Sequence, residues 1–208
     1  ANSGGFYVCP DDDARFDVLE KTADGGFTLT KLDQTRYSFN SGGNLTEIAN
    51  GRGQRVVVVT SSGFVSSITE PVSGVSLTFT YASSQLTRVA DNAGRDVEFA
   101  YLSGGLLGTI TDVNGNVHTY AYNAGGKLTS VIAPDGTVIC QNTYDNLGRV
   151  ISQDDALTTN SLMTFSYSET VKPGFVVTTV LDRTGAKSVF THDQKMRLVS
   201  QTDPLGLT

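Results

Sequence analysis

A glycine that follows an aspartate or asparagine by three residues recurs along this chain at nearly constant intervals. The pairs are Asn50/Gly53, Asp91/Gly94, Asp112/Gly115, Asp182/Gly185 and Asp203/Gly206, with Glu70/Gly74 and Asp135-Gly136 filling two gaps. Successive glycines of this series are 20 or 21 residues apart, except for one step of 49 that contains a degenerate boundary near residues 155–158. This period indicates a tandem array of small units rather than a domain with one core.

Pairs of aromatic or β-branched residues two positions apart form a second series within the first. They are Tyr37/Phe39, Val57/Val59, Phe79/Tyr81, Phe99/Tyr101, Tyr120/Tyr122, Phe165/Tyr167 and Phe190/His192, and one copy keeps only Tyr144. A short turn and an aliphatic stretch such as Leu128-Thr-Ser-Val131 follow each pair. Because residues two apart share one face of a strand, each unit is predicted to be strand, turn, strand, turn.

The sequence therefore predicts an all-β fold, an antiparallel meander of about eight two-strand units in residues 35–208. Residues 1–34 are less regular. Phe16/Val18 and Phe27/Leu29 alternate there, which predicts two or three more strands, with turns at residues 10–13 and 24–26.

Eight such units would supply roughly 16 strands, and twisted open sheets rarely exceed ~10 strands without curling or splitting. We expect the array to curl into an open spiral or part of a hollow β-shell. The spacing of three between Leu128 and Val131 does not keep one face in an ideal strand, so either a bulge corrects it or both faces are partly covered.

Three segments resemble the RHS/YD repeat, whose pattern is YDxxGRL followed by TDPxG. They are Tyr144-Asp-Asn-Leu-Gly-Arg-Val150, Leu128 to Gly136, and His192 to Gly206. The resemblance covers about residues 25–208, although Tyr-Asp is complete only at Tyr144-Asp145. It implies a wound β-sheet shell, which in polymorphic toxins, toxin-complex subunits and teneurin-like receptors encloses a toxin or other payload.

On this basis we expect a non-catalytic structural segment of a shell that scaffolds or encapsulates a payload. The alternative is a cell-surface adhesion or carbohydrate-binding module. The candidate site is the ladder of wall aromatics, which could face a ligand. Its members are Tyr37, Phe39, Phe79, Tyr81, Phe99, Tyr101, Tyr120, Tyr122, Tyr144, Phe165 and Tyr167.

Charge and hydropathy limit the partners. A net charge of −6 and a pI near 4.8 argue against nucleic acid. No apolar stretch approaches the ~20 residues that span a bilayer, and residues 1–5 carry no signal-peptide pattern. The expected partners are the rest of the same polypeptide or a payload domain, with self-association through sheet edges and glycan binding as further possibilities. We expect no cofactor, and a secreted or cell-surface location.

Four other features each have an ordinary structural interpretation and a functional one. Asp203-Pro-Leu-Gly-Leu207 resembles the motif at which family toxins are self-cleaved by aspartates, but it also fits an ordinary repeat turn. His118 and His192 lack the spacing of a zinc site, so structural roles are expected. The acidic triplet at residues 11–13 and the acidic pair at residues 154–155 suit solvated turns better than calcium sites. Cys9 and Cys140 are expected to be buried thiols, with a disulfide left open.

Overall fold

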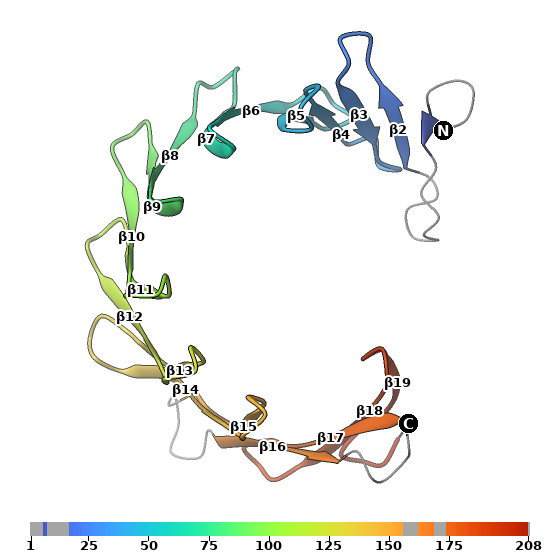
Figure 1. The fold of residues 1–208 in the computed structure, drawn as a ribbon, viewed down its shortest axis with the longest axis vertical. Helices are drawn as coiled ribbons and strands as arrows, with labels where there is room; N and C mark the ends of the chain where they lie inside the picture. Colours follow the sequence, from blue (N-terminus) through green and yellow to red (C-terminus); the bar gives the residue numbers. More distant parts are fainter. Residues whose placement is uncertain (1–5, 8–16, 156–161, 169–173, 208) are drawn as a thin grey trace. The chain divides into compact units, whose positions relative to one another are not determined.

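The computed structural model describes residues 6, 7, 17–155, 162–168 and 174–207, and its regular elements are all β-strands (Figure 1). The all-β prediction is thus confirmed. The strands are β1 (Phe6–Tyr7), β2 (Val18–Lys21), β3 (Phe27–Thr30), β4 (Arg36–Phe39), β5 (Leu45–Ala49), β6 (Arg55–Ser61), β7 (Phe64–Thr69), β8 (Ser76–Ala82), β9 (Gln85–Asp91), β10 (Asp96–Tyr101), β11 (Leu107–Thr111), β12 (Val117–Tyr122), β13 (Leu128–Ile132), β14 (Val138–Tyr144), β15 (Val150–Asp154), β16 (Leu162–Ser168), β17 (Phe175–Leu181), β18 (Lys187–Asp193) and β19 (Leu198–Thr202).

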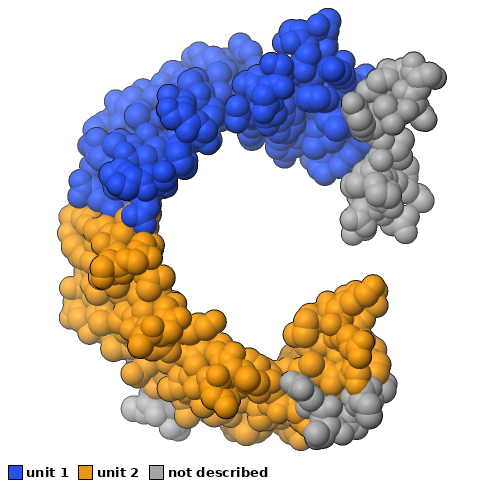
Figure 2. All heavy atoms as spheres, in the orientation of Figure 1, with its two compact units in different colours: residues 1–99 blue, residues 100–208 orange. Residues whose placement is uncertain are grey.

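The chain divides into two compact units, residues 1–99 and 100–208 (Figure 2). In the first unit, every strand from β1 to β10 pairs antiparallel with the next strand along the chain. In the second unit, the same holds from β11 to β19. Each unit is therefore an antiparallel meander, as the repeat predicts.

The Asp/Asn-x-x-Gly signature is a turn organised around one side chain. In the turn that starts at Asp145, the Oδ1 atom accepts the backbone N–H groups of Leu147 at 3.0 Å and Arg149 at 2.9 Å. Gly148 has a φ of 76°, a left-handed conformation that glycine adopts without steric cost. The same pair of side-chain bonds recurs at Asn40, Asn50, Asp91, Asp112, Asn123, Asp182, Asp193 and Asp203.

A β-bulge resolves the spacing of three between leucine and valine. Tyr122 lies opposite Leu128, but Ala121 lies opposite Ser130, so Thr129 is an extra residue on β13. The extra residue returns Val131 to the same face as Leu128. Equivalent register shifts occur in the hairpins β4–β5, β6–β7, β8–β9, β14–β15 and β18–β19.

Hydroxyls at the bulged positions help to fix three of these shifts. Thr46 and Ser66 donate to the carbonyls of Ser38 and Val59 at 3.1 Å, and Thr87 donates to the carbonyl of Thr80 at 3.2 Å. Each bond joins the extra residue to the partner strand. A small hydroxyl residue at this position therefore stabilises the local disruption of the ladder.

The bulges give the strands of each unit two distinct faces. We call the face that carries the aromatic pairs and the following Leu and Val the aromatic face. The opposite face, which we call the hydroxyl face, is rich in Ser and Thr: in β12 and β13 it carries Thr119, Ala121 and Ser130. Ion pairs join neighbouring strands on this face in the first unit, between Arg55 and Glu47 and between Arg88 and Asp96.

Neither unit has a packed core among the described residues. Ala49 and Val58, which are 4% and 5% exposed, are the buried hydrophobic residues there, and the largest side chains are all incompletely buried. Figure 1 shows the reason: within each unit the described strands form one layer, with no second layer of helices or strands from the same unit over them. Stability then comes from contacts between neighbouring strands, as in repeat proteins generally.

One prediction about the faces is wrong. Val57 and Val59 do not take the place of the aromatic pair in the second copy, because Val58 pairs with Ile68 and Thr60 pairs with Val65. Val58 and Thr60 therefore occupy the aromatic face, while Val59 lies on the hydroxyl face and is largely exposed. Four successive valines in β6 alternate between the faces, so their identity alone does not fix the register.

The lead-in residues form strands as expected. β2 and β3 pair through Val18–Lys21 and Phe27–Thr30, and a turn closed by the Gly25 N–H and the Thr22 carbonyl at 3.0 Å joins them. Phe16 and the turn expected at residues 10–13 lie outside the described part of the chain.

Candidate functional site: the aromatic face

The eleven predicted wall aromatics lie on β4, β8, β10, β12, β14 and β16. In the first unit the pairings place Tyr37, Phe39, Phe79, Tyr81 and Phe99 on one face, opposite aliphatic residues such as Ile48 and Val89. In the second unit they place Tyr120, Tyr122, Tyr144, Phe165 and Tyr167 on one face, while Tyr101 ends β10. The structure thus brings the predicted residues together within each unit. Their contact with a ligand stays a prediction.

Four of the tyrosines hydrogen-bond to the backbone of the preceding repeat. Each hydroxyl donates to a carbonyl on the adjacent strand, that of the first residue in the aliphatic stretch of the preceding repeat. The bonds are Tyr81 to Val65 at 2.9 Å, Tyr122 to Leu107 at 2.9 Å, Tyr144 to Leu128 at 2.6 Å and Tyr167 to Val150 at 2.6 Å. We call this bond the tyrosine staple.

The staple lies where the backbone ladder between two repeats has ended. Between β11 and β12, residues Thr109–Thr111 pair with Val117–Thr119, and Leu107 and Tyr122 lie beyond these pairs. The phenol supplies a hydrogen bond to a carbonyl that the ladder does not reach. The ladders β7–β8, β13–β14 and β15–β16 are equally short and carry the other staples.

Two boundaries between repeats follow another pattern. In β3–β4 the ladder continues to Phe39, which pairs with Phe27, and in β17–β18 it continues past His192, which pairs with Val176. Phenylalanine and histidine occupy the tyrosine position in these two copies. A ladder that extends this far takes the place of the staple.

A buried amide network replaces the first aromatic of the pair in β14. Asn142, which is 8% exposed, donates through Nδ2 to the Leu128 carbonyl at 3.2 Å and accepts from Gln153 Nε2 at 3.0 Å. The Gln153 amide also lies 3.5 Å from the half-buried Cys140 thiol. Polar groups at this depth need partners, and these groups have them. Cys9 lies outside the described residues.

Aspartate–arginine pairs add charge to the repeat turns. Arg149 donates through Nε to Asp145 Oδ2 at 2.8 Å, and its guanidinium carbon lies 4.4 Å from the centroid of the Tyr167 ring. Asp91–Arg95 and Asp193–Arg197 repeat the ion pair. The backbone N–H of Arg149 is the main group that lowers the pKa of Asp145, whereas burial raises the pKa of Tyr167. The Arg of the YDxxGR pattern thus serves both the turn and the next strand.

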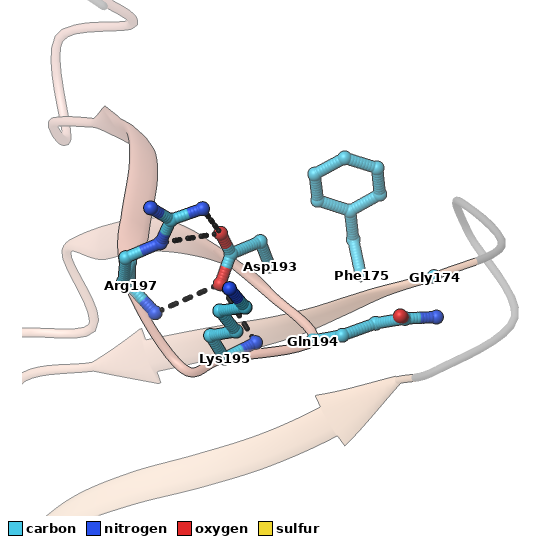
Figure 3. A pocket seen from close by; sticks show the side chains of 6 residues that line it. All are labelled: Gly174, Phe175, Asp193, Gln194, Lys195 and Arg197. Carbon is cyan, nitrogen blue, oxygen red and sulfur yellow. Dashed lines mark hydrogen bonds and ion pairs between the residues drawn. The ribbon is translucent and has the colours of Figure 1, made fainter.

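An open hollow of about 380 Å³ lies beside the turn that follows β18 (Figure 3). Its lining residues are Gly174, Phe175, Asp193, Gln194, Lys195 and Arg197. Figure 3 shows the Asp193 carboxylate bonded to the backbone and guanidinium of Arg197, with the Phe175 ring standing apart from both. The carboxylate is therefore engaged by its own turn.

The remaining candidates occupy ordinary repeat positions. His118 lies on β12 opposite Ile110, and Asp155 forms an ion pair with Arg183 at 2.8 Å. Asp203 Oδ1 accepts the N–H groups of Leu205 at 2.9 Å and Leu207 at 2.8 Å, as in the other repeat turns. The acidic triplet at residues 11–13 falls outside the described residues.

The described residues contain neither a cluster of metal-binding side chains nor a helix that could span a membrane. No group of three or more His, Cys, Asp or Glu side chains in this part of the chain is placed to hold a metal ion. Nor does this part contain a helix with the length and apolar character that a bilayer span requires.

Sequence reasoning missed the staples, although a signal was present. The second position of the aromatic pair is tyrosine at residues 81, 101, 122, 144 and 167, whereas the first position varies among Phe79, Phe99, Tyr120, Asn142 and Phe165. A position that keeps a hydroxyl while its neighbour changes indicates a hydrogen bond rather than simple wall packing.

Repeated hairpins with side-chain-centred turns, bulges and tyrosine staples define a tandem-repeat, single-layer β-protein of the YD type. The Teneurin YD-shell family model matches residues 28–142, which is more than half of the chain. The chain belongs to the Teneurin YD-shell family.

Similar proteins include bacterial toxins. The chain is 28% identical over 152 residues to "Double-stranded DNA deaminase toxin A" of Burkholderia cenocepacia (strain H111), covering 62% of this chain but 10% of the toxin. Solved structures include TcdB2-TccC3, at 10% identity, TM-score 0.40, and coverage of 91% of this chain and 17% of that one. The Photorhabdus luminescens Tc holotoxin pore aligns at 14% identity and TM-score 0.39, covering 86% and 11%. Scores this low do not establish a common fold, so the family rests on the sequence match.

Proposed function

We propose that this chain is a non-catalytic segment of a YD-repeat shell, and that its aromatic face lines a space that holds a toxin or other payload. The observation that carries the proposal is the aromatic face itself. It presents aromatic and aliphatic side chains from every repeat, yet within each unit no second layer of described residues covers it.

The two faces have different requirements. The hydroxyl face carries Ser, Thr and ion pairs, which suit contact with water. A continuous apolar face ordinarily marks a surface for a partner, because leaving it in water forgoes the free energy of burying it. Tyrosine suits a wall of this kind, since the ring is apolar and the staple satisfies the hydroxyl.

The comparisons support the same class of role. The chain spans about a tenth of the deaminase toxin that it matches, so the activity in that protein's name is not transferred to these residues. We propose instead that any enzymatic activity belongs to a payload elsewhere in the polypeptide or on a partner. A secreted or cell-surface location fits this proposal.

Cross-linking from the two faces tests the proposal. A photoreactive p-benzoylphenylalanine is placed at Tyr120 on the aromatic face or at Thr119 on the hydroxyl face, in the complete gene product. No staple involves Tyr120, so the exchange leaves the described hydrogen bonds intact. Mass spectrometry should find cross-links from position 120 to a segment outside the repeats. Cross-links from position 119 alone, or from neither position, would contradict the enclosure of a payload by the aromatic face.

Carbohydrate binding through the aromatic ladder stays an alternative. A glycan array would reveal saturable binding that disappears when Tyr120 and Tyr122 are both replaced by alanine. Self-association through sheet edges also stays a prediction, to be checked by light scattering over a range of concentrations.

A further inference from the structure

The strand β19 has a partner along only one of its two edges in the second unit. It pairs with β18, and it contacts no other described strand of that unit. By contrast, β13, β15 and β17 each lie between two strands of the unit. A free edge presents unpaired N–H and C=O groups, and a further strand can add to it.

The side chains of β19 are exposed where those of the equivalent strand are covered. Four of the five residues of β19 are exposed, whereas all five residues of β13 are half-buried. Leu198, which lies opposite His192 as Leu128 lies opposite Tyr122, is 54% exposed. An added strand would cover this apolar side chain, and burial of apolar surface stabilises such an association.

The four stapled boundaries define how an added strand would pair. In each of them, the residue two positions after the carbonyl acceptor lies opposite the residue three positions before the tyrosine. The pairs are Ser67 with Thr78, Thr109 with Thr119, Ser130 with Gln141, and Ser152 with Thr164. The staple and the strand register therefore occur together, which makes the register of an added strand predictable.

Leu198 holds the acceptor position in β19. Ser200 lies opposite Thr191 and Leu198 lies opposite His192, so Val199 is the extra residue of the bulge, as Thr129 is in β13. A tyrosine that donated to the Leu198 carbonyl would place the residue three positions before it opposite Ser200.

We infer that the free edge of β19 is a docking surface for the first strand of another YD-type repeat, from a part of the polypeptide outside residues 1–208, and that a tyrosine of this strand staples to the Leu198 carbonyl. The chain spans about a tenth of the toxin that it matches, so that related polypeptide has ample length for such a strand. The inference concerns a sheet edge rather than the aromatic face, so it does not depend on the enclosure of a payload.

Disulfide trapping of a peptide tests the docking and its register. The probe is a synthetic peptide with the sequence of residues 115–123, which contains β12 and its staple tyrosine, Tyr122. It is added to the 208-residue chain, in which Cys9 and Cys140 are replaced by serine.

The test compares two chain variants with two peptide variants. The chain carries Ser200→Cys or Gln201→Cys, and the peptide carries Thr119→Cys or His118→Cys. The inferred register places peptide position 119 opposite residue 200, and peptide position 118 opposite residue 201. Opposite residues of antiparallel strands come close enough for a disulfide, whereas adjacent residues point to opposite faces.

The two opposite combinations together should yield about tenfold more mixed disulfide than the two displaced combinations. Tyr122→Phe in the peptide should lower this yield about fivefold, because the staple is lost, and Tyr120→Phe is the matched control that should leave it unchanged. Equal yields from all four combinations, or no effect of Tyr122→Phe, would overturn the inference. Disulfide-linked dimers of the chain formed in preference to the peptide adduct would also overturn it, because they assign the edge to a second copy.

The complete gene product identifies the source of the strand. With p-benzoylphenylalanine in place of Gln201, cross-links should reach a tyrosine-containing segment of the same polypeptide outside residues 1–208. Cross-links to a second copy, or no cross-link, would contradict the inference. The cross-links from Tyr120 described above test payload enclosure separately, so the two proposals can fail independently.

Discussion

The boundaries β15–β16 and β17–β18 complete the hydrogen bonding between successive repeats in two different ways. Each joins the second strand of one repeat to the first strand of the next. In β15–β16, residues Ser152–Asp154 pair with Leu162–Thr164, and the Tyr167 hydroxyl then closes the gap to Val150. In β17–β18 the ladder runs from Leu181–Lys187 to Phe175–Asp193 with no staple.

The comparison shows that the tyrosine is a substitute for backbone pairing. A hydrogen bond from a side chain contributes about 1 kcal/mol net, similar to one from the backbone. A repeat can therefore lose the tyrosine where its ladder is extended, as at His192. The β15–β16 boundary, with its short ladder, depends on the Tyr167 phenol, which predicts different mutational sensitivities for the two boundaries.

Removal of the whole side chain should give the largest difference between the two boundaries in the free energy of unfolding. Tyr167→Ala deletes the staple and the ring that lies against Arg149, so we expect a loss of about 2 kcal/mol in the free energy of unfolding. His192→Ala at pH 7.5 should cost about 1 kcal/mol or less. Urea titrations measure both values, and equal losses would contradict the distinction.

Removing one oxygen isolates the staple. Tyr122→Phe leaves the Leu107 carbonyl without its donor and should cost about 1 kcal/mol. Tyr120→Phe, two residues earlier on the same strand, is the matched control and should change stability by less than about 0.3 kcal/mol. If the two variants are equally stable, the hydroxyl bond has no energetic role.

The turns that precede β15 and β19 differ in the residue that holds the positive-φ position. Gly148 has a φ of 76°, whereas Met196 has a φ of 59° at the equivalent position and is largely exposed. Met196→Gly should relieve backbone strain and raise stability by about 0.5 kcal/mol after the entropic cost of glycine. Lys195→Gly, where φ is not positive, should instead destabilise the chain, and thermal melts would distinguish the two.

The turn carboxylates have the smallest expected effect on stability at neutral pH, but they should make stability clearly dependent on pH in acid. Backbone and arginine hydrogen bonds lower the pKa of Asp145 and of Asp193 in the folded chain. Stabilisation by a carboxylate of lowered pKa is complete above its unfolded pKa, about 4, and is lost as the pH falls through the folded value. Melting temperature should therefore fall steeply below about pH 4.

The Asp145→Asn variant tests whether the turn carboxylates cause this fall in melting temperature. Asparagine keeps the Oδ1 acceptor, as Asn40, Asn50 and Asn123 do in their turns, but it cannot ionise. The variant should melt slightly below the parent chain at pH 7, and the difference should shrink as the pH falls below 4. A difference that stays constant from pH 7 to 2.5 would argue against the carboxylate as its source.

The repeat, the strands and the antiparallel order could be predicted because they rest on local patterns. Turn residues such as Asp145 and Gly148 fix where the chain reverses, and alternation at Tyr120 and Tyr122 fixes which residues share a face. Hydrophobic and turn patterns are properties of short segments, so a sequence displays them directly.

Register and tertiary hydrogen bonds could not be predicted in the same way. In β6 the residues Val57 and Val58 are chemically identical, and only pairing with β5 and β7 decides which one faces the aromatics. The acceptors of the staples are backbone carbonyls, which every residue has. Their choice depends on where a ladder ends, and that is a property of two strands rather than one.

The single extra residue at each bulge determines which of the following residues lie on each face of the sheet, as a reading frame determines which bases form each codon. Thr129 converts a spacing of three in the chain into a spacing of two in the sheet, so Leu128 and Val131 fall in phase with the tyrosines. Deleting one such residue would exchange the aromatic and hydroxyl faces for the rest of its strand, much as a frameshift changes every later codon. Gains and losses of sequence in a chain of this kind are therefore tolerated best as whole repeats.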